Sequence, residues 1–176
     1  MKSNVSSLLI AFAVYPFSIS AQGLETGYRG SIEIGYSKEI LGATMGFDWK
    51  EINTVHGYQA TPNIFLGAGV GVHFTPKIPY KSPFGARDNS TEIPVFADIQ
   101  WTMLKKNITP LVDLRVGHCI SDGSGMYTSI GGGCRMAIKS NTGVYVMFSY
   151  STHNKVDYNS MEDSNSGLSA RLGFEF

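Results

Sequence analysis

The residues best able to do chemistry in this chain are charged side chains that recur at alternate positions of strand-like segments. Arginine suits ion pairs in a confined space, because its planar guanidinium binds a carboxylate through two hydrogen bonds and stays charged. No lysine shares these positions, although lysine is common on an ordinary wet surface. The pattern therefore predicts an enclosed ion network. Its members are Arg29, Glu33, Glu51, Asp98, Asp113, Arg115, Arg135, Arg171 and Glu175.

Catalytic chemistry has weaker support in the sequence. The histidines are scattered over four segments, at His56, His73, His118 and His153. A lipid-modifying enzyme needs a histidine, a serine and a carboxylate together at one rim. His118 with Ser121 and Asp122, or His153 with Asp157, are the available combinations, but polar loops produce such sets easily by chance. We expect no enzyme, and keep lipid modification or proteolysis as an alternative.

The two cysteines show no metal-binding signature. A hairpin centred near Gly123 sets Cys119 opposite about Thr128 and Cys134 opposite about Asp113, roughly 20 Å apart. Their positions differ in parity, so Cys119 is expected to point inward and Cys134 outward. We predict no disulfide, no bound metal and no cofactor.

Two glycine-rich stretches resemble phosphate-binding loops only superficially. These are Gly67-x-Gly69-x-Gly71 and Gly131-Gly132-Gly133, and neither opens a helix. A spacing of two places the first set on one face of a strand, where glycine leaves room for neighbouring side chains.

Composition excludes several classes of protein. The chain has 176 residues, with 14 Lys+Arg against 14 Asp+Glu, so its formal net charge is zero. This balance predicts no nucleic-acid partner. With 43% hydrophobic residues, 20 Gly and 2 Cys, the chain is not disordered, a disulfide scaffold or a coiled coil.

The N-terminal residues 1–21 predict a secretory signal peptide. Lys2 precedes an apolar run at 8–15, followed by Pro16 and small residues up to Ala21, where we place the cleavage. That run is too short to cross a bilayer, and no apolar run of about 20 residues follows it. A helical membrane protein is thus excluded. Residues 22–176 form one expected domain, either a soluble periplasmic protein or an outer-membrane barrel.

Apolar and polar residues alternate with a period of two through eight segments, which predicts strands with one apolar face. The second segment is the weakest, because Ile52, Thr54, His56 and Tyr58 form a less apolar face. The segments cover about 28–37, 47–59, 64–75, 92–102, 108–117, 127–138, 143–151 and 167–176.

The connections between these segments alternate in length. Short ones at 60–63, 104–107 and 139–142 contain turn residues. Longer ones cover about 38–46, 76–91, 120–126 and 152–165. In an up-and-down meander all long connections meet at one end, as in outer-membrane barrels.

Eight strands close into a barrel whose interior is just filled by side chains, so an open pore is not expected. Closure pairs every backbone polar group, which allows a sheet to sit in lipid. Aromatic residues stand on the apolar face near segment ends, where interfacial girdles belong. They are Tyr28, Tyr36, Tyr58, Phe74, Trp101, Tyr150 and Phe176. The predicted fold is all-β, an eight-stranded antiparallel up-and-down transmembrane β-barrel.

From about Gly27 to Phe176 the chain resembles the small eight-stranded outer-membrane barrels of Gram-negative bacteria, a family that includes the transmembrane domain of outer-membrane protein A and the OmpX-like proteins. The resemblance implies a bacterial outer-membrane location, in contact with lipid and lipopolysaccharide. No peptidoglycan-binding domain follows Phe176, so a tethering role is not implied. The final strand looks like the family's signal for the barrel-assembly machinery, through Leu168, Ala170, Leu172, Phe174 and Phe176.

The connection at 76–91 carries three prolines and the cations Lys77, Lys81 and Arg87. These cations are candidates for contacts with lipopolysaccharide phosphates or a surface ligand. The alternative is a solvated loop without a partner.

The sequence thus predicts a non-enzymatic outer-membrane barrel that acts as a structural or surface-interaction protein through its long loops. A narrow porin-like channel is the main alternative. A soluble carrier of lipocalin type would need an apolar interior, which fits the charged positions badly.

Overall fold

The computed structural model describes residues 24–41, 48–76, 89–121, 125–139, 142–155 and 163–176. The expected signal peptide, residues 1–21, lies outside these ranges. No helix in the described ranges is long and apolar enough to cross a membrane. The strands are β1 (Gly27–Leu41), β2 (Trp49–Thr61), β3 (Ile64–Thr75), β4 (Ser90–Glu92), β5 (Pro94–Thr102), β6 (Ile108–Cys119), β7 (Met126–Ala137), β8 (Gly143–Lys155) and β9 (Asp163–Glu175).

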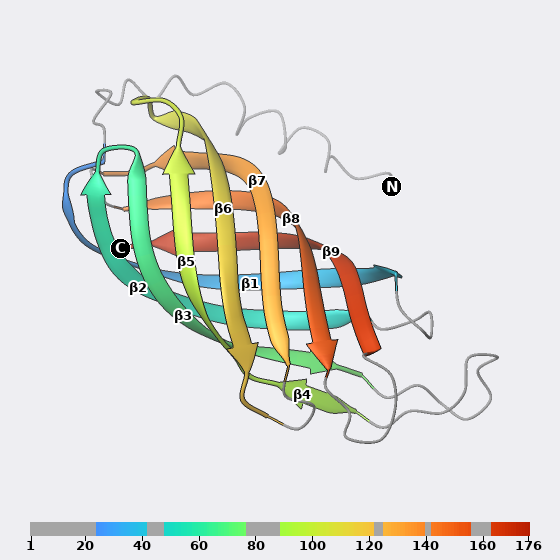
Figure 1. Ribbon diagram of the computed structural model, residues 1–176. Coiled ribbons are helices and arrows are strands. Elements are labelled where there is room, and N and C mark those ends of the chain that lie inside the picture. Colours follow the sequence, from blue (N-terminus) through green and yellow to red (C-terminus); the bar gives the residue numbers. More distant parts are fainter. Residues whose placement is uncertain (1–23, 42–47, 77–88, 122–124, 140–141, 156–162) are drawn as a thin grey trace, which may run out of the picture.

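The strands close into one antiparallel barrel, drawn in Figure 1. The barrel closes because the first strand, β1, pairs with the last, β9, as well as with β2. Ile34 of β1 lies opposite Ile52 of β2 on one side and Leu172 of β9 on the other. Since β4 and β5 both pair with β3, they form one barrel strand, and the barrel has eight. The predicted fold class is confirmed.

The fourth predicted strand is interrupted at Ile93. The backbone N–H of Ile93 donates to Ser121 Oγ at 3.0 Å, and its carbonyl accepts from the N–H of Ile120 at 3.0 Å. Pro94 follows and has no N–H to donate, which explains why the ladder breaks at this place.

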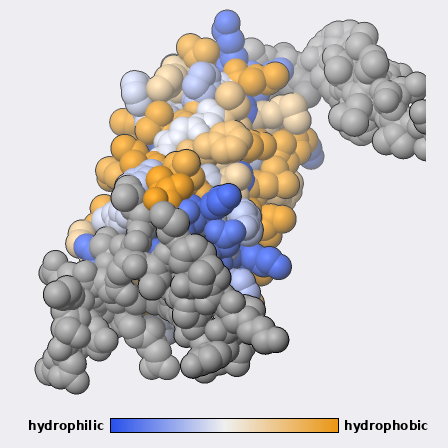
Figure 2. Space-filling model, turned by 90° about the vertical axis from the view of Figure 1, so that its right-hand side faces the viewer, coloured by the Kyte–Doolittle hydropathy of each residue, from blue (hydrophilic) through white to orange (hydrophobic). Residues whose placement is uncertain are grey.

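The alternation of faces is confirmed across the described strands. Outward side chains such as Ile32 and Ile130 are 52% and 57% exposed, whereas Arg115 on the inner face is 0% exposed. Cys119 is buried and Cys134 is exposed, and neither is in a disulfide. Figure 2 shows hydrophobic residues covering much of the visible wall.

The register of the β6–β7 hairpin differs from the prediction. His118 pairs with Met126, and Cys134 pairs with Pro110 instead of Asp113. The turn is therefore centred about one residue and a half earlier than expected. The predicted pairs joined residues of opposite faces, whereas the observed pairs join residues that face the same side, as direct cross-strand partners must. The predicted facing of Cys119 and Cys134 still holds, because it was read from the alternation within each strand.

Several strands are longer than predicted. β1 runs through Leu41, so the predicted connection at 38–46 begins too early. β8 runs through Lys155 and β9 begins at Asp163, so the predicted connection at 152–165 begins too early and ends too late. In a closed barrel each strand has a partner on both sides, and backbone pairing continues beyond the last apolar residue. Apolar alternation alone could not show these polar strand ends.

Candidate functional site

The inner face of the barrel collects all nine charged residues that the sequence singled out. Each of these nine residues is at most 2% exposed. They arrive there because every second residue of a strand points inward, and because small residues on the same face leave space. They form three connected layers along the barrel axis.

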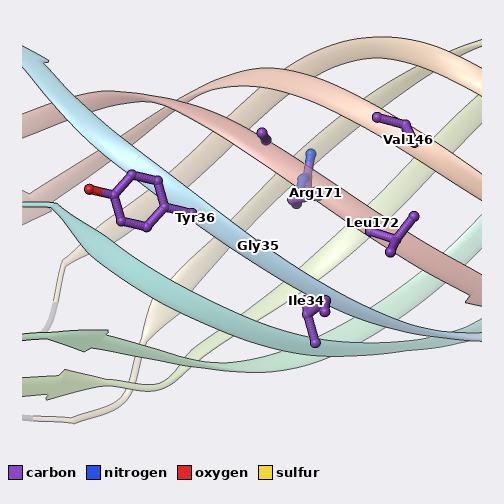
Figure 3. Close-up of a pocket in the computed structure, with 7 residues that line it drawn as sticks. Ile34, Gly35, Tyr36, Val146, Arg171 and Leu172 are labelled. Carbon is purple, nitrogen blue, oxygen red and sulfur yellow. The ribbon is translucent and has the colours of Figure 1, made fainter. Parts of the chain in front are cut away.

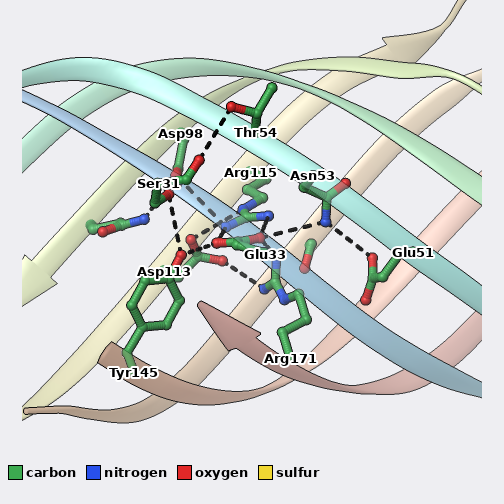
Figure 4. Close-up of polar contacts among 12 residues, drawn as sticks. Ser31, Glu33, Glu51, Asn53, Thr54, Asp98, Asp113, Arg115, Tyr145 and Arg171 are labelled. Atoms are coloured by element: carbon green, nitrogen blue, oxygen red, sulfur yellow. Dashed lines mark hydrogen bonds and ion pairs between the residues drawn. The ribbon is translucent and has the colours of Figure 1, made fainter. Parts of the chain in front are cut away.

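Arg115 of β6 is the centre of the middle layer, shown in Figure 4. Its Nη1 and Nη2 donate to the two carboxylate oxygens of Glu33 at 2.7 and 2.6 Å. Its Nε donates to Asp113 at 3.1 Å, and Asp98 lies 3.8 Å from Nη2. One guanidinium therefore bridges three carboxylates from β1, β5 and β6.

Arg171 of β9 supplies a second positive charge to this layer. Its Nη2 donates to Asp113 at 2.8 Å, and its Nη1 lies 3.7 Å from Glu33. The hydroxyl of Tyr145 also donates to Glu33. Glu33 is thus surrounded by two arginines and a phenol, which compensates the cost of enclosing its charge.

The layer nearer the short turns is built on Glu175. Arg135 Nε donates to one oxygen of this carboxylate, and Arg29 Nη1 lies 3.7 Å from the other. Arg29 also donates to Gln100, whose amide donates to Asp98 at 2.9 Å. Gln100 therefore joins this layer to the middle one.

The layer nearer the long connections contains Glu51. Asn53 donates to both Glu51 and Glu33 at 3.4 Å. His73 Nε2 lies 3.3 Å from Glu51 and 3.2 Å from Asn53 Oδ1. Sequence reasoning missed the neutral linkers Gln100, Asn53 and Tyr145, although their inward parity was a usable signal.

The candidate enzyme groups are not assembled in the described residues. His118 points outward and is exposed, while His153 points into the barrel. Asp122 and Asp157 lie outside the described residues, as do the loop cations Lys77, Lys81 and Arg87. The arginines of the three layers are instead paired with carboxylates.

The outer wall carries an apolar depression where β1, β8 and β9 meet (Figure 3). It is lined by Ile34, Gly35, Tyr36, Val146, Ala170, Arg171 and Leu172. The side chain of Arg171 is turned inward and buried, so the surface of this depression is hydrocarbon. The residues of the expected assembly signal, Leu168, Ala170, Leu172, Phe174 and Phe176, all lie on this outer face.

No protein-family model and no curated protein sequence matches the chain. Solved structures do match. Neisserial surface protein A is 14% identical, with a TM-score of 0.60 over 86% of this chain and 99% of that one. The N-terminal barrel of Pseudomonas aeruginosa OprF is 15% identical, with a TM-score of 0.48 over 86% of this chain and all of that one. Yersinia pestis Ail is 12% identical, with a TM-score of 0.48 over 87% of this chain and all of that one. The likeness to the Neisserial protein shows the fold.

Proposed function

We propose that this chain, whose fold is that of the small eight-stranded outer-membrane barrels, is a non-enzymatic integral protein of the bacterial outer membrane. Its lumen is closed by ion pairs, and its role is structural or one of surface interaction through the long connections. One observation carries the proposal. Large apolar side chains cover the outside, while buried charges fill the inside.

The apolar exterior supports a lipid environment. Soluble monomers rarely expose contiguous apolar patches above a few hundred Å². Here apolar side chains that are about half exposed occur on every one of the eight barrel strands, Ile34, Ile52, Leu66, Ile99, Leu114, Ile130, Phe148 and Leu172 among them. In a bilayer these side chains contact lipid hydrocarbon and not water. The closed backbone ladder leaves no strand edge with unpaired N–H and C=O groups in the lipid.

Exposed aromatic side chains near the strand ends favour the same environment. Tyr28 and Phe176 lie at the short-turn end, and Tyr36 and Phe74 lie toward the opposite end. Tyrosine and tryptophan are enriched at the two interfaces of a bilayer, because their rings are apolar and carry a polar tip. We propose that the depression beside Ala170 receives lipid hydrocarbon.

The middle layer of the lumen favours a plugged barrel over a narrow channel. Arg115 reaches from β6 to Glu33 on β1, the strand diametrically opposite in the pairing order. Water and ions would have to separate this buried pair to pass. A narrow channel is therefore the weaker alternative, and a conductance measurement tests it.

Export and surface contacts complete the proposal. Residues 1–21 would direct export, and the final strand ending at Phe176 would be recognised by the barrel-assembly machinery. Lys77, Lys81 and Arg87 would meet lipopolysaccharide phosphates, since cations bind phosphate oxygens through charge-assisted hydrogen bonds.

The test is fractionation of expressing cells, with protease treatment of intact cells as a second readout. We expect the full-length band in the outer membrane and cleavage within the long connections, with the strands protected. A protein recovered only in the soluble periplasmic fraction would contradict the proposal.

A further inference from the structure

Three side chains with metal-binding atoms meet inside the barrel at the end of the long connections. They are Glu92 of β4, Cys119 of β6 and His153 of β8, and all three are buried. One ligand atom from each lies within 4.8 Å of the other two. Three separate strands thus bring a carboxylate, a thiol and an imidazole to one point.

The distances are close to those that a metal ion would impose. His153 Nδ1 lies 3.8 Å from Cys119 Sγ and 2.8 Å from a carboxylate oxygen of Glu92. Around a tetrahedral Zn²⁺, with bonds of about 2.3 Å to sulfur and about 2.0–2.2 Å to nitrogen and oxygen, these separations are about 3.5 and 3.4 Å. The sulfur would move toward the imidazole nitrogen by about 0.3 Å, and the carboxylate oxygen away from it by about 0.6 Å.

A fourth polar side chain stands next to these three. His73 is the cross-strand partner of Glu92, and its ring centroid lies 5.3 Å from that of His153. His73 is 1% exposed, and its Nδ1 has no hydrogen-bond partner. A buried imidazole nitrogen left without a partner costs stability, which a bound cation or its water ligand would recover.

The charge inside the barrel also favours a divalent cation. Among the buried residues that the structure describes, four arginines face six carboxylates, with Glu92 as the sixth. The lumen therefore has a formal excess of two negative charges when its histidines are neutral. The other five carboxylates are Glu33, Glu51, Asp98, Asp113 and Glu175.

We propose that Glu92, Cys119 and His153 form a binding site for a divalent transition-metal ion of the zinc class. A ligand set of thiolate, imidazole and carboxylate suits zinc and its neighbours and excludes magnesium and calcium, which take oxygen ligands. The fourth position belongs to water or to His73. The site is independent of the proposed surface role, since it needs only the closed barrel.

Binding has a defined proton balance. The thiol of Cys119 loses its proton to solvent and binds as a thiolate. The metal takes the Nδ1 position of His153, so the neutral ring carries its proton on Nε2, which has no hydrogen-bond partner. The thiolate and the Glu92 carboxylate together neutralise the two charges of the cation. No bond is oxidised or reduced.

The experiment titrates Zn²⁺ and Co²⁺ into the full mature chain, purified in detergent with its thiols reduced. The variants are Cys119→Ser, Glu92→Gln and His153→Gln. Cys134→Ser is the matched control, because it removes the other cysteine, which is exposed on the outer face. Gel migration with and without boiling verifies that each variant is a closed barrel before metal is added.

We expect one Zn²⁺ per chain in wild type and in Cys134→Ser, and a loss of affinity of at least 100-fold in Cys119→Ser. Co²⁺ should show a thiolate-to-cobalt charge-transfer band and tetrahedral ligand-field bands that disappear with Cys119 and persist without Cys134. Mg²⁺ should not compete. Absence of stoichiometric binding in folded wild type, or equal binding by Cys119→Ser and Cys134→Ser, would overturn the proposal.

Discussion

The guanidinium of Arg115 and the carboxylate of Glu33 form a two-bond ion pair, at 2.7 and 2.6 Å, that crosses the barrel from β6 to β1. These strands are four steps apart in either direction around the wall. Neither side chain is more than 1% exposed. The pair therefore joins opposite walls across the interior of the barrel.

Truncation of Arg115 is expected to destabilise the barrel. Arg115→Ala leaves Glu33, Asp98 and Asp113 enclosed with one cation fewer, and an uncompensated buried charge costs about 3–5 kcal/mol. The measurement is urea unfolding and refolding in lipid vesicles. The double variant Arg115→Met/Glu33→Gln should recover part of this loss, because it removes both charges. Equal unfolding free energies of wild type and Arg115→Ala would contradict the account.

The same substitution is expected to open the lumen. In planar bilayers wild type should show no stepwise conductance, since the middle layer is filled by paired side chains. Arg115→Ala, and Arg135→Ala at the layer near the short turns, should allow small conductance events. Lys50→Ala is the control, because Lys50 is exposed on the outside. Clear conductance in wild type would favour the channel alternative.

Gly173 is expected to be intolerant of a methyl group. An added Cβ would collide with the ring of Tyr145, its cross-strand partner, whose hydroxyl donates to Glu33. Gly173→Ala should therefore cost about 1–3 kcal/mol of unfolding free energy, as overpacking usually does.

Gly132 is the matched control for this prediction. It faces outward, and a Cβ there meets only the carbonyl of Leu111 at 3.9 Å. Gly132→Ala should leave stability unchanged or slightly raised, since glycine is unfavourable in strands. If refolding titrations show the same loss for both variants, the close packing of Tyr145 on Gly173 is not what limits this position.

Phe176 is expected to matter more for assembly than for the finished barrel. Its backbone exchanges hydrogen bonds of 2.9 and 3.0 Å with Gly30, which Phe176→Ala preserves, while its exposed ring is removed. Outer-membrane yield in cells should fall severalfold, whereas refolding from urea into detergent should proceed as in wild type. A variant with normal yield in cells would show that the terminal ring is not a recognition signal.

Much of the fold was predictable because a barrel strand has a strict period of two. Parity alone places Arg115, Cys119 and Glu33 inside, and Ile130 and Cys134 outside. The register error at the β6–β7 hairpin did not alter this result, because the facing of each residue was read from the alternation within its own strand and not from its cross-strand partner.

The heights of residues on different strands were not predictable in the same way. They depend on the stagger of the closed barrel, which no local pattern encodes. Cys119 was expected on the inner face, but His153 was assigned only to a loop-end set with Asp157, and Glu92 was not singled out. Glu92, Cys119 and His153 meet through the stagger of strands β4, β6 and β8 around the barrel, whereas the expectation of no metal site rested on chain spacing alone.

We infer that the apolar face of the barrel meets lipid and that the charged face fills a closed lumen. This assignment of the faces is tested most directly by gel migration of the outer-membrane fraction in detergent, with and without boiling. We expect a band in that fraction that migrates differently after boiling, because a closed barrel resists unfolding by detergent alone. A soluble periplasmic band with unchanged migration would mean that the faces are assigned inside out.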